Sequence, residues 1–145
     1  PTPWEPASSL FFHQLNFSPM VTTEVAQLSQ ECNAWRETLR SNRDEFGQLK
    51  QQLQKIAGQQ SLKEDLLQVE HLDNQIHIQL INIHDLKQSI KAHDRKINFE
   101  KALFNGSANE DSLSQHERLL EEFQSLEQTL EDLRQEFNKF LERSK

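Results

Sequence analysis

Residues 69–97 read VEHLDNQIHIQLINIHDLKQSIKAHDRKI, and an aliphatic side chain returns at every seventh position of this stretch. The repeat continues on both sides of the stretch, through Leu62, Val69, Ile76, Ile83, Ile90, Ile97 and Phe104. Because seven residues make about two turns of an α-helix, these side chains share one face. The spacing predicts a single long amphipathic helix over about residues 62–104.

The positions beside this repeat indicate how many neighbours the helix has. Four residues after a repeat position, Leu66 and Leu80 are apolar, whereas the other slots are charged: Asp73, Lys87, Asp94 and Lys101. On the opposite flank, Leu72 and Leu86 extend the apolar stripe. Apolar residues on both flanks are typical of a helix that contacts two neighbours.

Two further segments carry apolar residues at alternating spacings of three and four, which is the pattern of a coiled-coil seam. The first spans about residues 19–57, with Ser18 as its cap and Pro19 at the first helical position. Its seam is Val25, Leu28, Cys32, Trp35, Leu39, Phe46, Leu49, Leu53 and Ile56, with the polar Asn42 in one slot. The second spans about residues 112–143, with the seam Leu119, Phe123, Leu126, Leu130, Leu133, Phe137 and Phe140.

The links between these segments are short. Gly58 ends the first segment, and residues 61–64 form a capping box before the second. Asn105 and Gly106 end the second, since glycine favours the left-handed cap, and residues 112–115 form another capping box. Short links make neighbouring helices antiparallel. We therefore expect an all-α, antiparallel up-down-up three-helix bundle over residues 19–145, with an ordered N-terminal extension over residues 1–18.

Charge favours the same pairing of helices. The cations of the middle helix form one stripe, made of Lys87, Lys91 and Arg95. Folding back across the second link is expected to bring this stripe near three acidic residues of the last helix, Glu121, Glu122 and Glu127. Each such exposed pair contributes about 0–1 kcal/mol, so the pairs select the topology more than they stabilise it.

The middle helix carries an apolar strip that the bundle does not need. Leu67, Ile78 and Ile81 fall roughly opposite the seven-residue repeat, on a face that a three-helix bundle exposes to water. Either a second copy of the chain covers this strip or the N-terminal segment does. That segment is rich in aromatic residues, and we expect Trp4, Phe11, Phe12 and Phe17 to form a second contact patch.

Composition narrows the function classes. The 145-residue chain has a formal net charge of −7, which disfavours nucleic acid and anionic membranes as partners. It contains no apolar run of about 18 residues, so no membrane insertion is expected. Its one cysteine, Cys32, cannot form an internal disulfide, and no secretory signal pattern is visible. These features predict a cytoplasmic protein.

The motif search predicts neither catalytic residues nor a cofactor. None of the three glycines lies in a phosphate-binding loop, and no serine lies in a nucleophile elbow. No histidine has the Glu-x-x-His or i,i+4 spacing of helical metal sites, and Cys32 in its seam slot reads as a small buried hydrophobe. Asp73 and His77, four residues apart, keep open the alternative of a bundle that binds a metal or small ligand.

Several residues of the first two helices resemble a known pattern. Trp35 followed by Leu39, residues 43–46 (RDEF), residues 69–71 (VEH) and residues 74–75 (NQ) are similar to motifs of small coiled-coil proteins from Bacteroidetes-type bacteria. The resemblance spans roughly residues 35–140, although Leu72 stands where that pattern has Phe. It implies a bacterial, cytosolic helical protein. The group has no assigned activity, so the resemblance implies no mechanism.

The sequence thus favours a non-enzymatic helical-bundle protein that acts through protein contacts, with a homodimer or another protein as its assembly. The expected contact residues are Leu67, Ile78 and Ile81, together with Trp4, Phe11, Phe12 and Phe17. An alternative is an adaptor that docks into a larger machine through its N-terminal aromatic segment.

Overall fold

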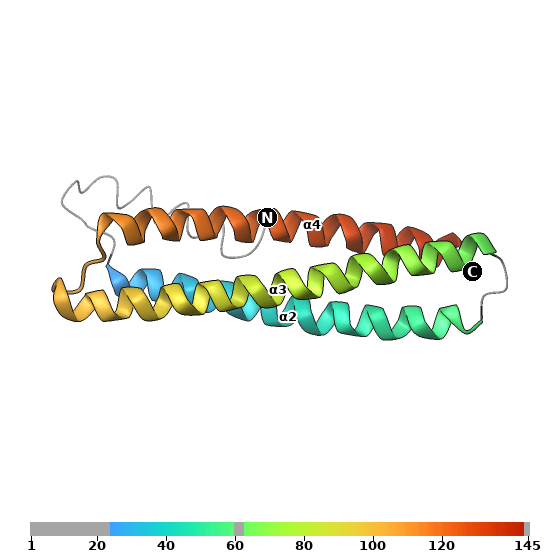
Figure 1. Cartoon of the computed structure of the whole chain (residues 1–145), viewed down its shortest axis with the longest axis horizontal. Coiled ribbons are helices and arrows are strands. Elements are labelled where there is room, and N and C mark those ends of the chain that lie inside the picture. Colours follow the sequence, from blue (N-terminus) through green and yellow to red (C-terminus); the bar gives the residue numbers. More distant parts are fainter. Residues whose placement is uncertain (1–23, 60–62, 144–145) are drawn as a thin grey trace.

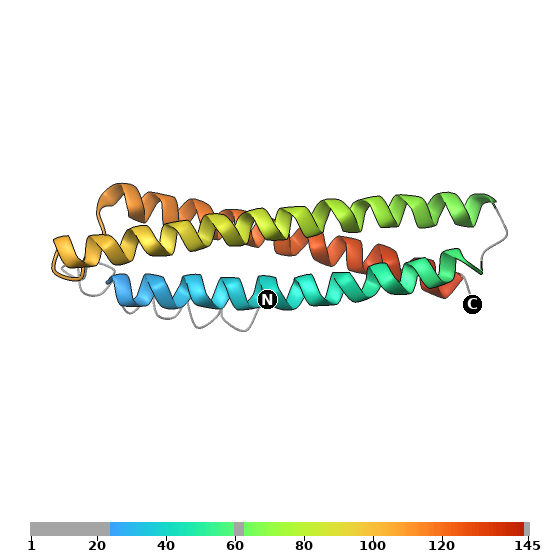
Figure 2. The same ribbon diagram turned by 60° about the horizontal axis from the view of Figure 1, so that its bottom comes forward.

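The computed structural model describes residues 24–59 and 63–143. These residues form three helices: α2 (Val25–Ala57), α3 (Lys63–Leu103) and α4 (Glu110–Arg143). Figures 1 and 2 show the helices side by side, each running opposite to the one before it. The predicted all-α, up-down-up three-helix bundle is confirmed. The N-terminal extension over residues 1–18 lies outside the described residues.

The core is a continuous column of seam residues from the three helices. All seven predicted seam residues of α4, Leu119 to Phe140, are buried, as are most of those of α2. The largest side chains that solvent does not reach include Trp35, Phe46, Phe123, Phe137 and Phe140. The 41 residues of α3 give a rod of about 60 Å.

The second row of the α3 seam differs from the prediction. The buried positions lie three residues after each repeat position, not four: Leu72, Gln79, Leu86, His93 and Glu100. Leu66, which the sequence analysis placed in the seam, is 41% exposed. The physical reason lies in partners on α4 and on the link before it, since His93 bonds His116 and Glu100 accepts from Ser112. Three polar side chains therefore sit in the core.

The helix α2 begins later than predicted. Glu24 has an extended backbone, so the first helical residue is Val25 and not a residue near Pro19. No side chain caps this end. Instead the Val25 N–H donates to the carbonyl oxygen of Gly106 at 3.0 Å, and Glu24 forms a β-bridge with Ser107. The start of α2 is thereby fastened to the link between α3 and α4.

That link begins with the predicted Asn105–Gly106 turn, in which both residues have positive φ, +52° and +92°. Asn105 takes the left-handed cap position, and the Gly106 N–H donates to the Lys101 carbonyl at 3.0 Å. The turn carries Phe104 out of the seam, where it is 47% exposed. Its place as the last repeat residue was therefore predicted wrongly.

The start of α4 also differs from the prediction. Asn109 caps the helix, since its Oδ1 accepts from the Ser112 N–H at 2.8 Å. Ser112 is buried and donates through its hydroxyl to Glu100 at 2.7 Å, so it is not the cap of a capping box. Glu100 also accepts from the backbone and side-chain N–H groups of Asn109, both at 3.2 Å. The Glu100 carboxylate therefore joins the end of α3 to the start of α4 through three hydrogen bonds.

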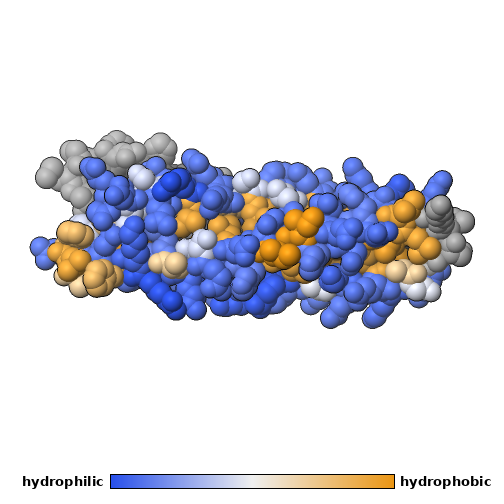
Figure 3. Space-filling view, in the orientation of Figure 1, coloured by the Kyte–Doolittle hydropathy of each residue, from blue (hydrophilic) through white to orange (hydrophobic). Residues whose placement is uncertain are grey.

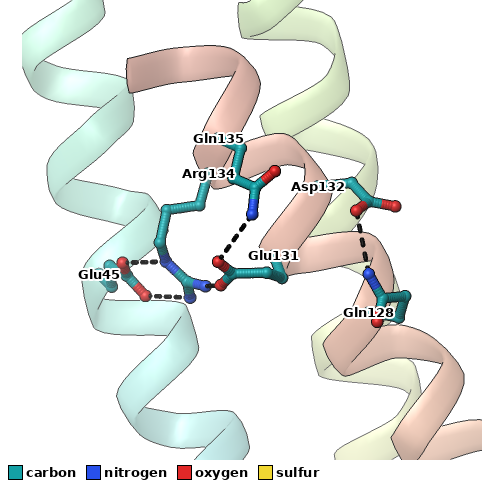
Figure 4. Close-up of polar contacts among 6 residues, drawn as sticks. All are labelled: Glu45, Gln128, Glu131, Asp132, Arg134 and Gln135. Atoms are coloured by element: carbon teal, nitrogen blue, oxygen red, sulfur yellow. Dashed lines mark hydrogen bonds and ion pairs between the residues drawn. The ribbon is translucent and has the colours of Figure 1, made fainter. Parts of the chain in front are cut away.

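Ion pairs join all three helices. Arg134 of α4 donates through two nitrogens to the two oxygens of Glu45 on α2, at 2.6 and 2.7 Å, and also contacts Glu131 (Figure 4). Its guanidinium lies 5.4 Å from the centre of the Phe46 ring. The Glu45 carboxylate raises the pKa of Arg134 above its usual value. Planar two-point contacts of this kind fix orientation as well as distance.

The charged stripe of α3 lies near α2 at Lys87. Desolvation, and after it the charges of Arg43, Arg40 and Arg36 of α2, lowers the pKa of Lys87. The expected pairing of the stripe with the glutamates of α4 stays a prediction. The partner of Arg36 is Asp94 of α3, at 4.0 Å.

Truncating an aromatic side chain should lower the free energy of unfolding much more at a buried position than at an exposed one. We expect Phe137→Ala to lower the free energy of unfolding by about 3–5 kcal/mol, because the ring is fully buried. Phe99→Ala is the matched control, since that ring is 68% exposed and its loss should change stability by about 0.5 kcal/mol or less. Urea titration followed by circular dichroism measures both. Equal effects would contradict the described core.

The carboxylate inside the α3–α4 turn can be tested with an isosteric change. Glu100→Gln should cost about 1–3 kcal/mol, because an amide nitrogen would replace one oxygen that accepts from Ser112 and Asn109. Glu117→Gln, on the exposed surface of α4, is the control. Thermal unfolding of both variants checks this. A Glu100→Gln variant as stable as the wild type would contradict the assigned network.

Candidate functional site

The predicted contact residues of α3 lie on the surface. Leu67 is 57% exposed, Ile78 45% and Ile81 47%. Within the described residues they belong to a larger set of exposed apolar side chains, all on α3 or directly after it, which adds Leu66, Phe99, Leu103 and Phe104. In the space-filling view, apolar surface gathers near both ends and in the middle of the bundle (Figure 3). We call Leu67, Ile78, Ile81 and the exposed Ala92 the α3 strip.

Of the other predicted site residues, the structure describes Asp73 and His77. Trp4, Phe11, Phe12 and Phe17 lie outside the described residues, so their packing stays a prediction. Asp73 pairs with Lys50 of α2, 3.7 Å away, while His77 is exposed on α3. In the structure, Asp73 therefore forms an ion pair with Lys50. In the metal-binding alternative, its expected neighbour was His77.

A second candidate site is buried inside the bundle. Cys32 of α2, His93 of α3 and His116 of α4 meet in one layer of the core, and one ligand atom from each lies within 4.8 Å of the others. The three side chains are at most 4% exposed. We call these three residues the Cys–His–His cluster. It lies in the half of the bundle that holds the α3–α4 link, since Cys32 is near the start of α2, His93 near the end of α3 and His116 near the start of α4.

Hydrogen bonds orient the two imidazoles. The Nε2 of His116 lies 3.0 Å from an oxygen of Glu31, and its Nδ1 lies 2.9 Å from the Nε2 of His93. Because a carboxylate only accepts, the Nε2–H of His116 donates to Glu31. In the neutral ring, Nδ1 then accepts from the Nε2–H of His93. The ring of Trp35 packs against His116 with centroids 4.6 Å apart and planes tilted by 35°.

The surroundings favour the uncharged forms of His93 and Cys32. Burial, and after it the charge of His116, lowers the pKa of His93 from 6.5 to about 4. Burial also raises the pKa of the Cys32 thiol from 9.0 to about 12, with the carboxylates of Asp94 and Glu31 adding to the effect. The Nδ1 of His93 is buried and makes no hydrogen bond of ordinary geometry within the described residues, although the Gln115 amide favours the protonated ring.

Sequence reasoning missed this cluster because it tested histidine spacings within single helices. The three residues come from three helices, and only the seam register brings them together. The sequence did contain a signal for the cluster. Counting back from Leu119 by three and then by four residues, the α4 seam passes through His116 and Ser112. The same steps place His93 in the α3 seam. Aligning three antiparallel seams layer by layer would have found the cluster.

A groove between α3 and α4 is a further concave feature of the described residues. Its volume is about 730 Å³, and it is open to solvent along the bundle. Its lining brings Arg118 next to Glu121 and Glu122 and includes Ser89 and Ser125. Neither serine has a histidine among the residues lining the groove in the described part of the chain. The groove therefore offers no activated nucleophile.

With both sites described, the chain was compared with protein-family models, curated proteins and solved structures. None of them matches it. The resemblance to the Bacteroidetes-type coiled-coil proteins therefore stays a prediction. Among the described helices, none combines the length and apolar character needed to cross a membrane.

The depressed pKa of His93 makes stability depend on pH. The folded protein keeps His93 neutral down to about pH 4, whereas the unfolded chain takes up the proton near pH 6.5. The free energy of unfolding should therefore fall by up to roughly 3 kcal/mol from this residue as the pH drops across that window. Urea titrations at pH 7, 6 and 5 measure the slope.

His93→Leu should flatten this slope, although it also removes the bond to His116. His84→Leu is the matched control, because His84 is exposed on the same helix and should leave the slope unchanged. Parallel slopes for the wild type and His93→Leu would contradict the assignment.

Proposed function

We propose that this protein is a non-enzymatic helical bundle that acts through protein–protein contacts and that its partner is a second copy of the chain. The supporting observation is the α3 strip, which remains exposed when the three seams are closed. At about 100° per residue, its four members fall within a sector of roughly 60° on α3. An apolar row of this kind marks an interaction surface on a soluble helix.

Charge favours an antiparallel partner helix of the same sequence. Residues 63–82 hold four acidic side chains and one lysine, whereas residues 83–103 hold five basic and three acidic side chains. Two copies of α3 that run in opposite directions place each acidic half beside a basic half. A parallel arrangement would juxtapose like charges, which is unfavourable. An antiparallel pair is also what a two-fold axis across the helix produces.

The strip itself sets the register. With the two-fold axis between Ile78 and Ile81, Ile78 of each copy meets Ile81 of the other. The same register brings Leu67 near Ala92 of the second copy, one apolar pair on each side of the axis. It also brings the exposed Glu64 near Lys96 of the second copy, where opposite charges attract.

Two further features are part of the proposal. The described groove offers no activated nucleophile, which supports a non-enzymatic role. The buried, protonated Cys32 thiol suits a reducing compartment, and we place the protein in the cytoplasm.

Sedimentation equilibrium tests the self-association. The wild type should form a dimer at micromolar concentration, and Ile78→Asp/Ile81→Asp should be monomeric, since the dimer would bury four new carboxylates. Gln51→Asp/Gln54→Asp is the matched control, because it adds the same charges at the same spacing on exposed positions of α2. Its dimer should persist. A monomeric wild type, or equal dissociation of both variants, would overturn the proposal.

Charge reversal tests the register. Lys96→Glu should weaken the dimer, and adding Glu64→Lys should restore it, because the pair is then reversed. Deletion of residues 1–18 distinguishes a second copy of the chain from the N-terminal segment as the cover of the α3 strip. A dimer that appears only after this deletion would show that the N-terminal segment occupies the strip.

A further inference from the structure

We propose that the Cys–His–His cluster binds one transition-metal ion, with Zn²⁺ the best chemical match. A thiolate and two imidazoles are the ligands that Zn²⁺ prefers, and three protein ligands leave one tetrahedral position for water or a small anion. The ligand atoms already lie within 4.8 Å of one another and come from all three helices. An ion there would join α2, α3 and α4 at one point.

The hydrogen bonds around the cluster fit a ligand site. The Nδ1 of His116 faces His93 at 2.9 Å, while its other nitrogen donates to Glu31 at 3.0 Å. Metal-binding histidines commonly donate their second N–H to a carboxylate, which fixes the tautomer and raises the basicity of the ligating nitrogen. Glu31 has this position relative to His116. An ion would replace the proton shared by the two rings.

The burial of the cluster gives a second, independent reason. A column of aliphatic and aromatic seam residues would be the ordinary filling of this core, yet one layer holds a thiol and two imidazoles. Polar groups in such a position cost stability unless they have a partner, and a bound ion would engage the cluster.

The chemistry of binding balances through protons. The thiol of Cys32 must release its proton to solvent. The proton on the Nε2 of His93 must move to the Nδ1 of the same ring, so that this Nε2 and the Nδ1 of His116 exchange their hydrogen bond for two nitrogen–metal bonds. The other charged groups around the cluster are two carboxylates and two cations: Glu31, Asp94, Arg36 and Lys96. The two carboxylates offset the charge of the ion. No electron transfer is involved. Access is through fraying of the bundle end near the α3–α4 link, since helix ends open most readily.

Cobalt substitution tests the site in the full-length protein. After chelator treatment under reducing conditions, Co²⁺ should bind at one equivalent and give the thiolate-to-cobalt absorption band with the intense visible bands of a tetrahedral ion. Zn²⁺ should abolish both signals. The affinity should weaken as the pH falls, because protons compete for all three ligands. A wild type without stoichiometric binding, or with a weak octahedral spectrum only, would overturn the proposal.

Variants locate the ion. Cys32→Ser is close to isosteric, so it should keep the helical circular dichroism but lose the thiolate band and the rise in melting temperature that Zn²⁺ gives the wild type. Glu31→Gln should lower the affinity by about 10- to 100-fold, as expected for a residue that orients a ligand. His77→Ala/His84→Ala removes two exposed histidines and is the control. Loss of the cobalt spectrum in this control, or its persistence in Cys32→Ser, would contradict the assignment.

Discussion

The seam that runs along three antiparallel helices determines almost everything else in this structure. Because apolar residues return at steps of three and four, each helix presents a narrow stripe that only two neighbouring stripes can cover. α3 lies against both other helices, and its buried positions follow that rule from Val69 to Glu100. The same spacing fixes which residues share a layer. It therefore places Cys32, His93 and His116 together, although 84 positions separate the first from the last.

The sequence was sufficient for the fold class and most of the core, because these depend on periodicity. The strongly repeating positions, such as Ile76, Ile83 and Ile90, are buried as expected. The second row of α3 was harder to assign, since Gln79, His93 and Glu100 are polar and do not look like core residues. Their burial follows from partners that a single helix does not reveal. Glu100, for example, accepts from Asn109 and Ser112 across the turn.

The residues at which the helices begin and end depend on contacts with other parts of the chain, and the local sequence signals did not predict them. Ser18 and Pro19 resemble a helix start, but α2 begins at Val25, where a carbonyl oxygen from another part of the chain accepts its first N–H. Phe104 keeps the seven-residue spacing, yet the positive φ of Asn105 ends the helix before it. The candidate sites divide in the same way. The α3 strip could be predicted from one helix, whereas the buried cluster required the register of all three.

The bond between Val25 and Gly106 couples a helix end to a turn some eighty positions later in the chain. Most contacts within a helix are local and form early, but this one closes a long loop and carries a large entropic cost until the rest of the bundle exists. The opening turn of α2 thus depends on a turn that is synthesised some eighty residues after it. During translation it would remain without its acceptor until the α3–α4 link had left the ribosome.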